Sequence, residues 1–291
     1  MRLEWIRRMT ESLEWIERRL EESFAIEDVA RAAFTSPFHY QRMFFMVTGM
    51  TVAEYVRKRR LTLAAQELAM SPVKVVDVAL KYGYDSPESF AKAFRKIHGI
   101  SPSEARQPGA KLKAFPRLSF HLSLRGDKDM DYKIVDKDAF VVAGKAYRTT
   151  CAGGENSREI PTFWAASNAD GTVKRLAGLS TDGNVLGVIA DMTPGSDEFT
   201  YLIAAEIEDA ARAQGQDGFV TRTIPAATWA VFTSVGPLPG AIQDVFRRIY
   251  QEWFPATGYE HAAGAELEVY PAGDTASADY RCEVWVPIVK K

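Results

Sequence analysis

Apolar residues in the first hundred positions recur at the spacing of amphipathic helices. In the first segment they stand three or four residues apart, with Arg and Glu between them, at Leu3, Ile6, Met9, Leu13, Ile16 and Leu20. This spacing predicts a first helix of about five turns. Similar patterns, bounded by capping residues, predict further helices over residues 26–33, 37–47, 52–70, 75–81 and 87–98. The N-terminal region is therefore expected to be all-α.

Two of these predicted helices share a start signal. Ser36-Pro37 and Ser86-Pro87 each place a capping serine before a proline at the first helical position, and a glycine ends each helix. A shorter helix and a tight turn precede each pair. The sequence thus predicts helix, turn and capped helix twice over, about fifty residues apart.

After about Asp129 the hydrophobic pattern changes from helical spacing to short runs rich in Val, Ile, Tyr, Trp and Phe, separated by turn residues. Such runs predict strands. They cover residues 140–147, 185–191, 200–207, 228–235, 266–270 and 281–289. With two helical segments between them, they indicate an α+β domain built around a sheet.

The second domain carries the pattern of an internal duplication. Phe140–Gly144 corresponds to Thr228–Phe232 as an entry strand, and Thr200–Ile207 corresponds to Arg281–Ile288 as an exit strand. Between them, the helical stretches 161–168 and 241–254 correspond. Each half is strand, helix, strand, strand, and a cleft between two such halves is a usual place for a ligand.

A polar stretch at residues 107–113 separates the two patterns and marks the boundary between domains. We expect a helical domain at 1–110, a linker at 111–128 and an α+β domain at 129–291. The predicted fold class is therefore multidomain, all-α followed by a duplicated α+β domain.

Length and charge agree with two domains of different function. The chain has 291 residues, enough for two cores. Residues 1–113 carry 19 Lys/Arg against 14 Asp/Glu, and the rest carries 17 against 24. A basic part followed by an acidic part is typical of a nucleic-acid module joined to a domain that does not touch nucleic acid.

Composition also limits location and chemistry. No apolar run approaches the roughly 18 residues that cross a bilayer, and the N-terminus lacks the pattern of a signal peptide, so we expect a cytoplasmic protein with no membrane partner. Cys151 and Cys282 have no partner at metal-ligand spacing. The sequence therefore predicts no disulfide framework, no metal site and no cofactor.

Residues 23–106 resemble the AraC/XylS transcription regulators. The resemblance is carried by Ser36-Pro-Phe-His-Tyr-Gln-Arg-Met-Phe44, Thr48-Gly49, Arg59-Arg-Leu61, Gly83-Tyr-Asp-Ser86, Phe94-Arg-Lys96 and Gly99-Ile-Ser-Pro-Ser-Glu-Ala-Arg106. It implies a double helix-turn-helix that binds double-stranded DNA, with RNA polymerase as a further partner.

In a helix-turn-helix the second helix enters the major groove with its first turns against base edges. On helix 37–47 one face carries Phe38, Gln41 and Arg42, which suit a thymine methyl, an adenine and a guanine or phosphate. The matching residues of helix 87–98 are Glu88, Ser89 and Lys92. Helix 52–70 would act as a spacer between successive grooves, roughly 34 Å apart. Two alternatives stay open: Phe38 covers the core, and Glu88 pairs with Lys92 instead of contacting cytosine.

The sequence departs from this family at two positions. Ala25 stands where a Ser or Thr cap is usual, which costs about 1 kcal/mol unless Ser23 substitutes. Phe34 stands in a turn where glycine is frequent, and we therefore expect that turn to avoid positive φ.

Residues 129–289 resemble the GyrI-like effector-binding domains of multidrug-sensing regulators. The resemblance is carried by Ile224–Phe232, Gly236-Pro237, Ile249–Phe254, Glu266–Gly273 and Tyr280–Ile288. It implies a small-molecule effector that is lipophilic and often cationic or aromatic. The aromatic residues expected to wall the effector site, where cations are held by cation–π contact, are Trp164, Tyr201, Trp229, Tyr270 and Trp285.

The resemblance also implies one carboxylate as counter-charge. Glu268 falls where the family places its ligand-facing glutamate, and Glu266, with the same strand parity, is the alternative. A single carboxylate in a pocket is also compatible with a second hypothesis for the function, a hydrolase that acts on a small electrophilic compound. A third, alkyl transfer to cysteine, lacks the Pro-Cys-His setting at either Cys151 or Cys282. The sequence favours an effector-controlled transcription regulator over both.

Overall fold

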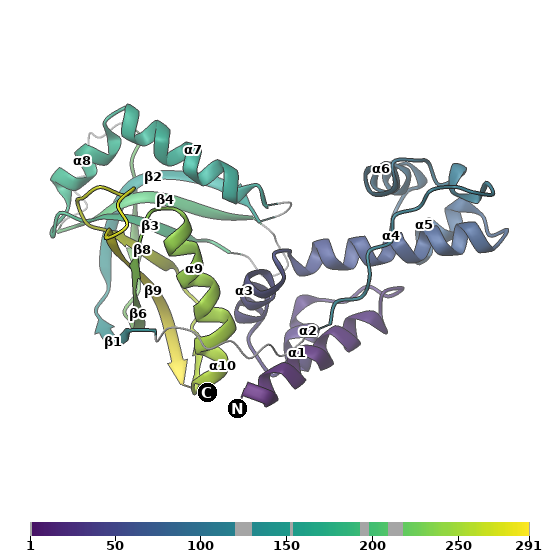
Figure 1. Ribbon diagram of the computed structural model, residues 1–291, viewed down its shortest axis with the longest axis horizontal. Helices are drawn as coiled ribbons and strands as arrows, with labels where there is room; N and C mark the ends of the chain where they lie inside the picture. The colour runs from purple at the N-terminus through teal and green to yellow at the C-terminus, as the bar shows by residue number, and fades with distance from the viewer. Residues whose placement is uncertain (1, 120–129, 152–153, 193–197, 209–217, 291) are drawn as a thin grey trace. The chain divides into compact units, whose positions relative to one another are not determined.

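The computed structural model describes residues 2–119, 130–151, 154–192, 198–208 and 218–290. The chain forms two compact units (Figure 1). The helical unit comprises Leu3–Pro37 and Val52–Ser123, and the sheet unit comprises Met1–Arg2, Phe38–Thr51 and Leu124–Lys291. Helix α3 (Pro37–Thr48) therefore packs with the sheet, although its sequence lies between helices of the other unit.

The helical unit confirms the helices predicted from the sequence. Its elements are α1 (Arg2–Glu17), α2 (Ile26–Ala32), α4 (Val52–Met70), α5 (Val75–Lys81), α6 (Pro87–His98) and the short η1 (Glu104–Arg106). Leu61 and Leu68 on α4 join Phe90 and Phe94 on α6 in one buried core. The side chain of Ser86 caps α6 by accepting the amide of Ser89 at 3.1 Å.

The two departures from the family pattern have different outcomes. The backbone amide of Ala25 donates to the carboxylate of Asp28 at 3.4 Å. This is one of the two hydrogen bonds of a capping box, and the start of α2 has it although Ala25 has no capping side chain. Our expectation for Phe34 was wrong, because its φ is +53°. The turn keeps the left-handed conformation that glycine usually supplies, and the ring of Phe34 is exposed.

The strands and helices of the sheet unit include the six predicted strands in the predicted order, and also strands at residues 132–137, 220–224 and 259–261 and a helix at 172–179 that the sequence analysis did not predict. In chain order, the elements are β1 (Tyr132–Lys137), β2 (Phe140–Thr150), α7 (Asn156–Ala169), α8 (Thr172–Leu179), β3 (Val185–Ala190), β4 (Glu198–Ile207), β5 (Val220–Ile224), β6 (Ala227–Val235), α9 (Gly240–Arg248), the π-helical turn η4 (Ile249–Trp253), α10 (Phe254–Ala256), β7 (Tyr259–His261), β8 (Glu266–Tyr270) and β9 (Arg281–Lys290).

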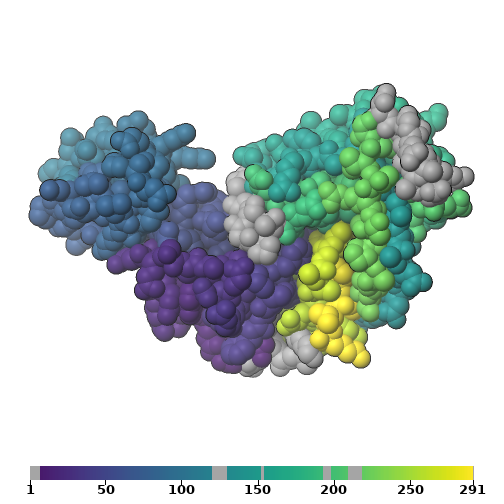
Figure 2. All heavy atoms as spheres, turned by 180° about the vertical axis from the view of Figure 1, so that it is seen from behind, coloured from purple at the N-terminus to yellow at the C-terminus, as the bar shows by residue number. Residues whose placement is uncertain are grey.

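The strand order shows the internal duplication. The sheet runs β1-β6-β9-β8-β3-β4-β2-β5, and β7 pairs with β9. Around the central β8–β3 pair, β9 and β6 of the second half mirror β4 and β2 of the first. The strand before each half, β1 or β5, pairs with the opposite half. The space-filling view shows the teal first half and the green-to-yellow second half forming one continuous body (Figure 2).

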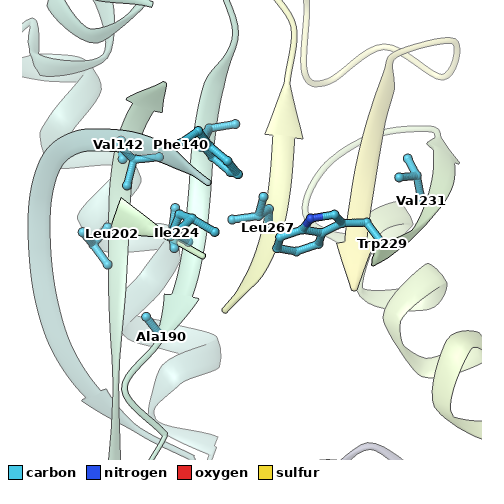
Figure 3. Close-up of a cluster of buried hydrophobic side chains, with 11 residues drawn as sticks. Phe140, Val142, Ala190, Leu202, Ile224, Trp229, Val231 and Leu267 are labelled. Atoms are coloured by element: carbon cyan, nitrogen blue, oxygen red, sulfur yellow. The ribbon is translucent and has the colours of Figure 1, made fainter. Parts of the chain in front are cut away.

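The two faces of the sheet have different cores. One face gathers a cluster from six strands that includes Phe140, Leu202 and Leu267, and Trp229 points toward Leu267 within it (Figure 3). On the other face, Leu179 of α8 packs against Ala143 and Ile207. We call the cluster that contains Phe140, Leu202, Trp229 and Leu267 the Trp229 cluster. Because side chains alternate along a strand, residues on either side of Leu267 face away from it.

Candidate functional site

A buried carboxylate surrounded by aromatic groups lies on the sheet face opposite the Trp229 cluster. Glu268 of β8 accepts hydrogen bonds from the hydroxyls of Tyr201 and Tyr270, the latter at 3.1 Å. The indole nitrogen of Trp164, on α7, donates to the hydroxyl of Tyr201 at 2.9 Å. The rings of Trp164 and Tyr270 meet edge to face, with centroids 5.1 Å apart. We call these four residues the Glu268 cluster.

The Glu268 cluster joins the two halves of the duplication. Trp164 and Tyr201 come from the first half, and Glu268 and Tyr270 come from the second. Tyr201 and Glu268 are buried, whereas Trp164 and Tyr270 are half-buried. The aromatic rings thus border a carboxylate that is shielded from bulk water.

Burial raises the pKa of Glu268 above its ordinary value of 4.5, and the hydrogen bonds from Tyr201 and Tyr270 only partly oppose this effect. Burial and the nearby charge of Glu268 raise the pKa of Tyr201 well above 10. The tyrosines therefore remain hydrogen-bond donors at neutral pH. A carboxylate that is costly to ionise without a partner favours the approach of a cation.

Gly187 makes room for the Glu268 cluster. It lies on β3 directly opposite Glu268 in the strand register. A Cβ at this position would meet the carboxylate of Glu268 and the hydroxyl of Tyr201, with the Cζ of Tyr201 at 3.0 Å. A glycine inside an otherwise apolar strand, Val185–Ala190, is the sequence signal for such a close approach, and our sequence analysis missed it.

The structure does not bring Trp229 and Trp285 to the Glu268 cluster. The two rings pack edge to face, with centroids 6.0 Å apart, in the core of the opposite sheet face. Trp285 pairs in register with Leu267, and Glu268 pairs with Val284. The sequence analysis counted aromatic residues on strands without fixing which strand faces meet, and the alternation of side chains separates these two from the rest.

Glu266, the alternative ligand carboxylate, already has a full set of protein partners. Arg42 of α3 donates to it in bidentate fashion, with Nε at 2.9 and 3.0 Å from the two carboxylate oxygens. The hydroxyl of Tyr250 donates to it, and Nε2 of His261 lies 3.0 Å away. Burial by itself raises the pKa of Glu266, but the charge of Arg42 and the hydrogen bond with His261 hold that pKa well below its usual range. Glu266 is thus ionised and paired.

The predicted DNA-contacting residues divide between the two units. Glu88, Ser89 and Lys92 lie exposed on α6, where they are open to a partner. On α3 the situation differs, because Arg42 is buried against Glu266 and the ring of Phe38 lies 4.7 Å from that of His261. Gln41 is half-buried. The sequence analysis could not anticipate the position of Arg42, since its partner lies 224 residues away in the chain.

The described residues offer no grouping of His, Cys, Asp and Glu side chains that would hold a metal ion. Both cysteines are buried and neither forms a disulfide within the described residues, and burial raises the pKa of the Cys282 thiol to about 11. Over the same residues, no helix is long and apolar enough to cross a membrane.

Comparisons with known proteins match both parts of the chain. The family model of integron-associated effector-binding proteins matches residues 133–288, and a helix-turn-helix domain model matches residues 29–108. The HTH-type transcriptional activator AarP of Providencia stuartii is 43% identical over 95 residues, which are 33% of this chain and 70% of that protein. The right origin-binding protein of Escherichia coli K12 is 27% identical and spans 94% of this chain and 95% of its own.

Among solved structures, SAV2435 bound to tetraphenylphosphonium has a TM-score of 0.49 and 20% identity, covering 55% of this chain and 94% of its own. The match to the effector-binding model covers more than half of the chain, and the match to AarP covers more than two thirds of that regulator. The chain therefore belongs to the AraC-type helix-turn-helix transcription regulators, as a DNA-binding protein whose C-terminal domain is of the integron-associated effector-binding family.

Proposed function

We propose that the chain controls transcription in response to a lipophilic cation that binds at the Glu268 cluster. The observation that carries this proposal is a buried carboxylate bordered by aromatic side chains from both halves of the sheet. Aromatic faces attract cations through their quadrupole, and the carboxylate supplies the opposite charge in a medium of low dielectric constant. Removing water from an effector of this kind costs little free energy, because its charge is spread over apolar groups.

The hydrolase reading has no comparable support. In the described part of the chain, the groups that form hydrogen bonds with Glu268 are tyrosine hydroxyls, which donate to the carboxylate. Such an arrangement stabilises charge and does not activate a nucleophile. Tyr201 and Tyr270 are therefore proposed as binding residues, together with Trp164 and Glu268.

The DNA-binding part of the proposal assigns base contacts to α3 and α6. Phe38, Gln41 and Arg42 remain our candidates on α3, and Glu88, Ser89 and Lys92 remain our candidates on α6. The domain limits 1–110, 111–128 and 129–291 belong to the same proposal. RNA polymerase is proposed as a further partner because AarP, a relative, is named as a transcriptional activator.

The affinity for tetraphenylphosphonium, a cation with four phenyl groups, should fall as the solution is acidified. Only the ionised carboxylate attracts the cation, and burial raises the pKa of Glu268, so the loss begins above pH 4.5. Well below the raised pKa, each further pH unit should cost up to about tenfold in affinity. Calorimetric titration across pH 4–8 measures this effect. An affinity independent of pH throughout that range would contradict the role of Glu268.

A Gln41→Ala variant should bind specific DNA about tenfold more weakly, since a bidentate base contact contributes roughly 1–3 kcal/mol. The probe is a duplex that the full chain selects from a random pool, called the selected duplex below. Fluorescence anisotropy measures its affinity alongside that of a scrambled duplex. The matched control is Gln66→Ala on α4, outside the predicted reading helices. Equal losses on both duplexes would remove Gln41 from base recognition.

A further inference from the structure

Helix α3 belongs to the same compact unit as the sheet and makes contacts with it at its start, its centre and its end. At its start, the ring of Phe38 packs on His261, and Nδ1 of His39 accepts the backbone amide of His261 at 3.3 Å. Near its end, the side chain of Gln251 donates to the carbonyl of Met46 at 3.3 Å. This carbonyl belongs to the last helical turn, whose carbonyls have no partner within the helix. The contacts therefore cover both ends of α3.

The centre of this interface is the pair Arg42–Glu266. The two side chains are 5% and 1% exposed, which makes this ion pair one that solvent does not screen. The guanidinium of Arg42 lies 5.4 Å from the ring centroid of Phe246 and 5.7 Å from that of Tyr250. Burial by itself lowers the pKa of Arg42, but the charge of Glu266 and the hydrogen bonds to its carboxylate more than offset this and hold that pKa above its ordinary value. Arg42 is thus a buried, charged group with dedicated partners.

The docked face of α3 is the face assigned to DNA. Phe38, Arg42 and Met46 follow one another at steps of four residues, and so lie on one side of the helix. Phe38 and Arg42 are also two of the three side chains that we assign to base contacts. The same face cannot contact His261 and Glu266 while it lies in a major groove. The two arrangements exclude each other.

We propose that the docking of α3 through Arg42 and Glu266 is an autoinhibitory contact, which withholds the first reading helix until the helix leaves the sheet unit. This inference rests on the proposed role of α3 in DNA binding. The apparent affinity of a protein for its ligand falls in proportion to the fraction of molecules in the competent state. Weakening the docked state raises that fraction and so strengthens specific DNA binding.

The first test compares full-length wild type with Glu266→Gln, which keeps the shape of the side chain and removes the charge that holds Arg42. The selected duplex should bind the variant at least about fivefold more tightly. Removal of any acidic residue also reduces general repulsion of DNA, so the matched control is Glu252→Gln. Glu252 lies on the neighbouring η4 and forms an ion pair with Arg248 at 3.0 Å, a pair that does not include a residue of α3. This control should bind both the selected and the scrambled duplex nearly as the wild type does.

The second test needs no variant. Hydrogen exchange of the wild type should show faster exchange at residues 259–268 when the selected duplex is added at saturation, because these residues lose α3 as a neighbour. If exchange there is unchanged, or if folded Glu266→Gln binds the selected duplex no better than the wild type, the contact is structural and the proposal is overturned.

The Gln41→Ala variant distinguishes failure of the autoinhibition proposal from failure of the proposed role of α3 in DNA binding. When it weakens specific binding and these tests fail, only autoinhibition is wrong; when it has no effect, the role of α3 in reading DNA is wrong.

Discussion

Replacing Glu268 by Gln should weaken tetraphenylphosphonium binding at least about thirtyfold, which corresponds to about 2 kcal/mol. Glutamine keeps the size of the side chain, and its amide oxygen still accepts from the hydroxyls of Tyr201 and Tyr270. The variant therefore loses the counter-charge and little else. In a buried setting a nearby opposite charge contributes more than in water, which is why the effect should exceed that of an exposed carboxylate. Calorimetric titration of the full chain measures the loss.

The control for this variant is Glu283→Gln, a carboxylate change on the neighbouring strand β9. Glu283 pairs with Lys133 at 3.0 Å and accepts from the indole of Trp285 at 2.8 Å, and it points to the opposite sheet face from Glu268. Its replacement should leave cation affinity within about twofold of the wild type. Wild-type affinity in a folded Glu268→Gln protein would show that the cation binds elsewhere.

A Gly187→Ala substitution should impair both stability and cation binding. The added methyl group meets the carboxylate of Glu268 and the hydroxyl of Tyr201, so one or both must move away from their present positions. Crowding of this kind typically costs about 1–3 kcal/mol in the free energy of unfolding. We expect at least a tenfold loss of tetraphenylphosphonium affinity as well, because the displaced groups are those that bind the cation.

The matched control is Gly178→Ala on α8, where a Cβ would meet no atom within 4 Å. Alanine in a helix is more favourable than glycine by up to about 1 kcal/mol, so this variant should be as stable as the wild type or more so. Chemical denaturation and calorimetric titration of both variants give the comparison. If Gly187→Ala retained the stability and the cation affinity of the wild type, the close packing of β3 against the Glu268 cluster would have no functional role.

The sequence predicted local structure well, because local structure depends on nearby residues. Helix starts such as Ser86-Pro87 and strands such as Glu266–Tyr270 follow from capping and alternation within a few residues. The duplication was also visible, since both halves repeat one order of elements. Three short or edge strands, at residues 132–137, 220–224 and 259–261, were not predicted. The turn at Phe34 was predicted wrongly, because the surrounding structure imposes a positive φ that local preference disfavours.

The candidate site was predicted only in part, for reasons of long-range geometry. Glu268, Tyr270, Tyr201 and Trp164 were expected and lie together, but Trp229 and Trp285 belong to the other sheet face. Pairing between strands decides which aromatic groups meet, and the sequence does not state it. The docking of Arg42 on Glu266 depends in the same way on a contact between distant parts of the chain.

The short distance along β8 between Glu268, which we assign to the cation, and Glu266, which holds Arg42 of α3, suggests how a cation would affect DNA binding. Glu266 and Glu268 lie on the same face of the strand, two residues and about 7 Å apart. A cation held by Glu268 places a positive charge near Arg42 and so weakens the pairing of Arg42 with Glu266. Since two ligands that favour the same state strengthen one another, cation and DNA should bind cooperatively.

One measurement tests effector control most directly, namely the affinity of the full chain for the selected duplex with and without saturating tetraphenylphosphonium. We expect the cation to strengthen binding at least about fivefold in the wild type and to have no effect in Glu268→Gln. A cation that binds the wild type, as calorimetry would show, yet leaves the affinity for the selected duplex unchanged would contradict control of DNA binding through the Glu268 cluster.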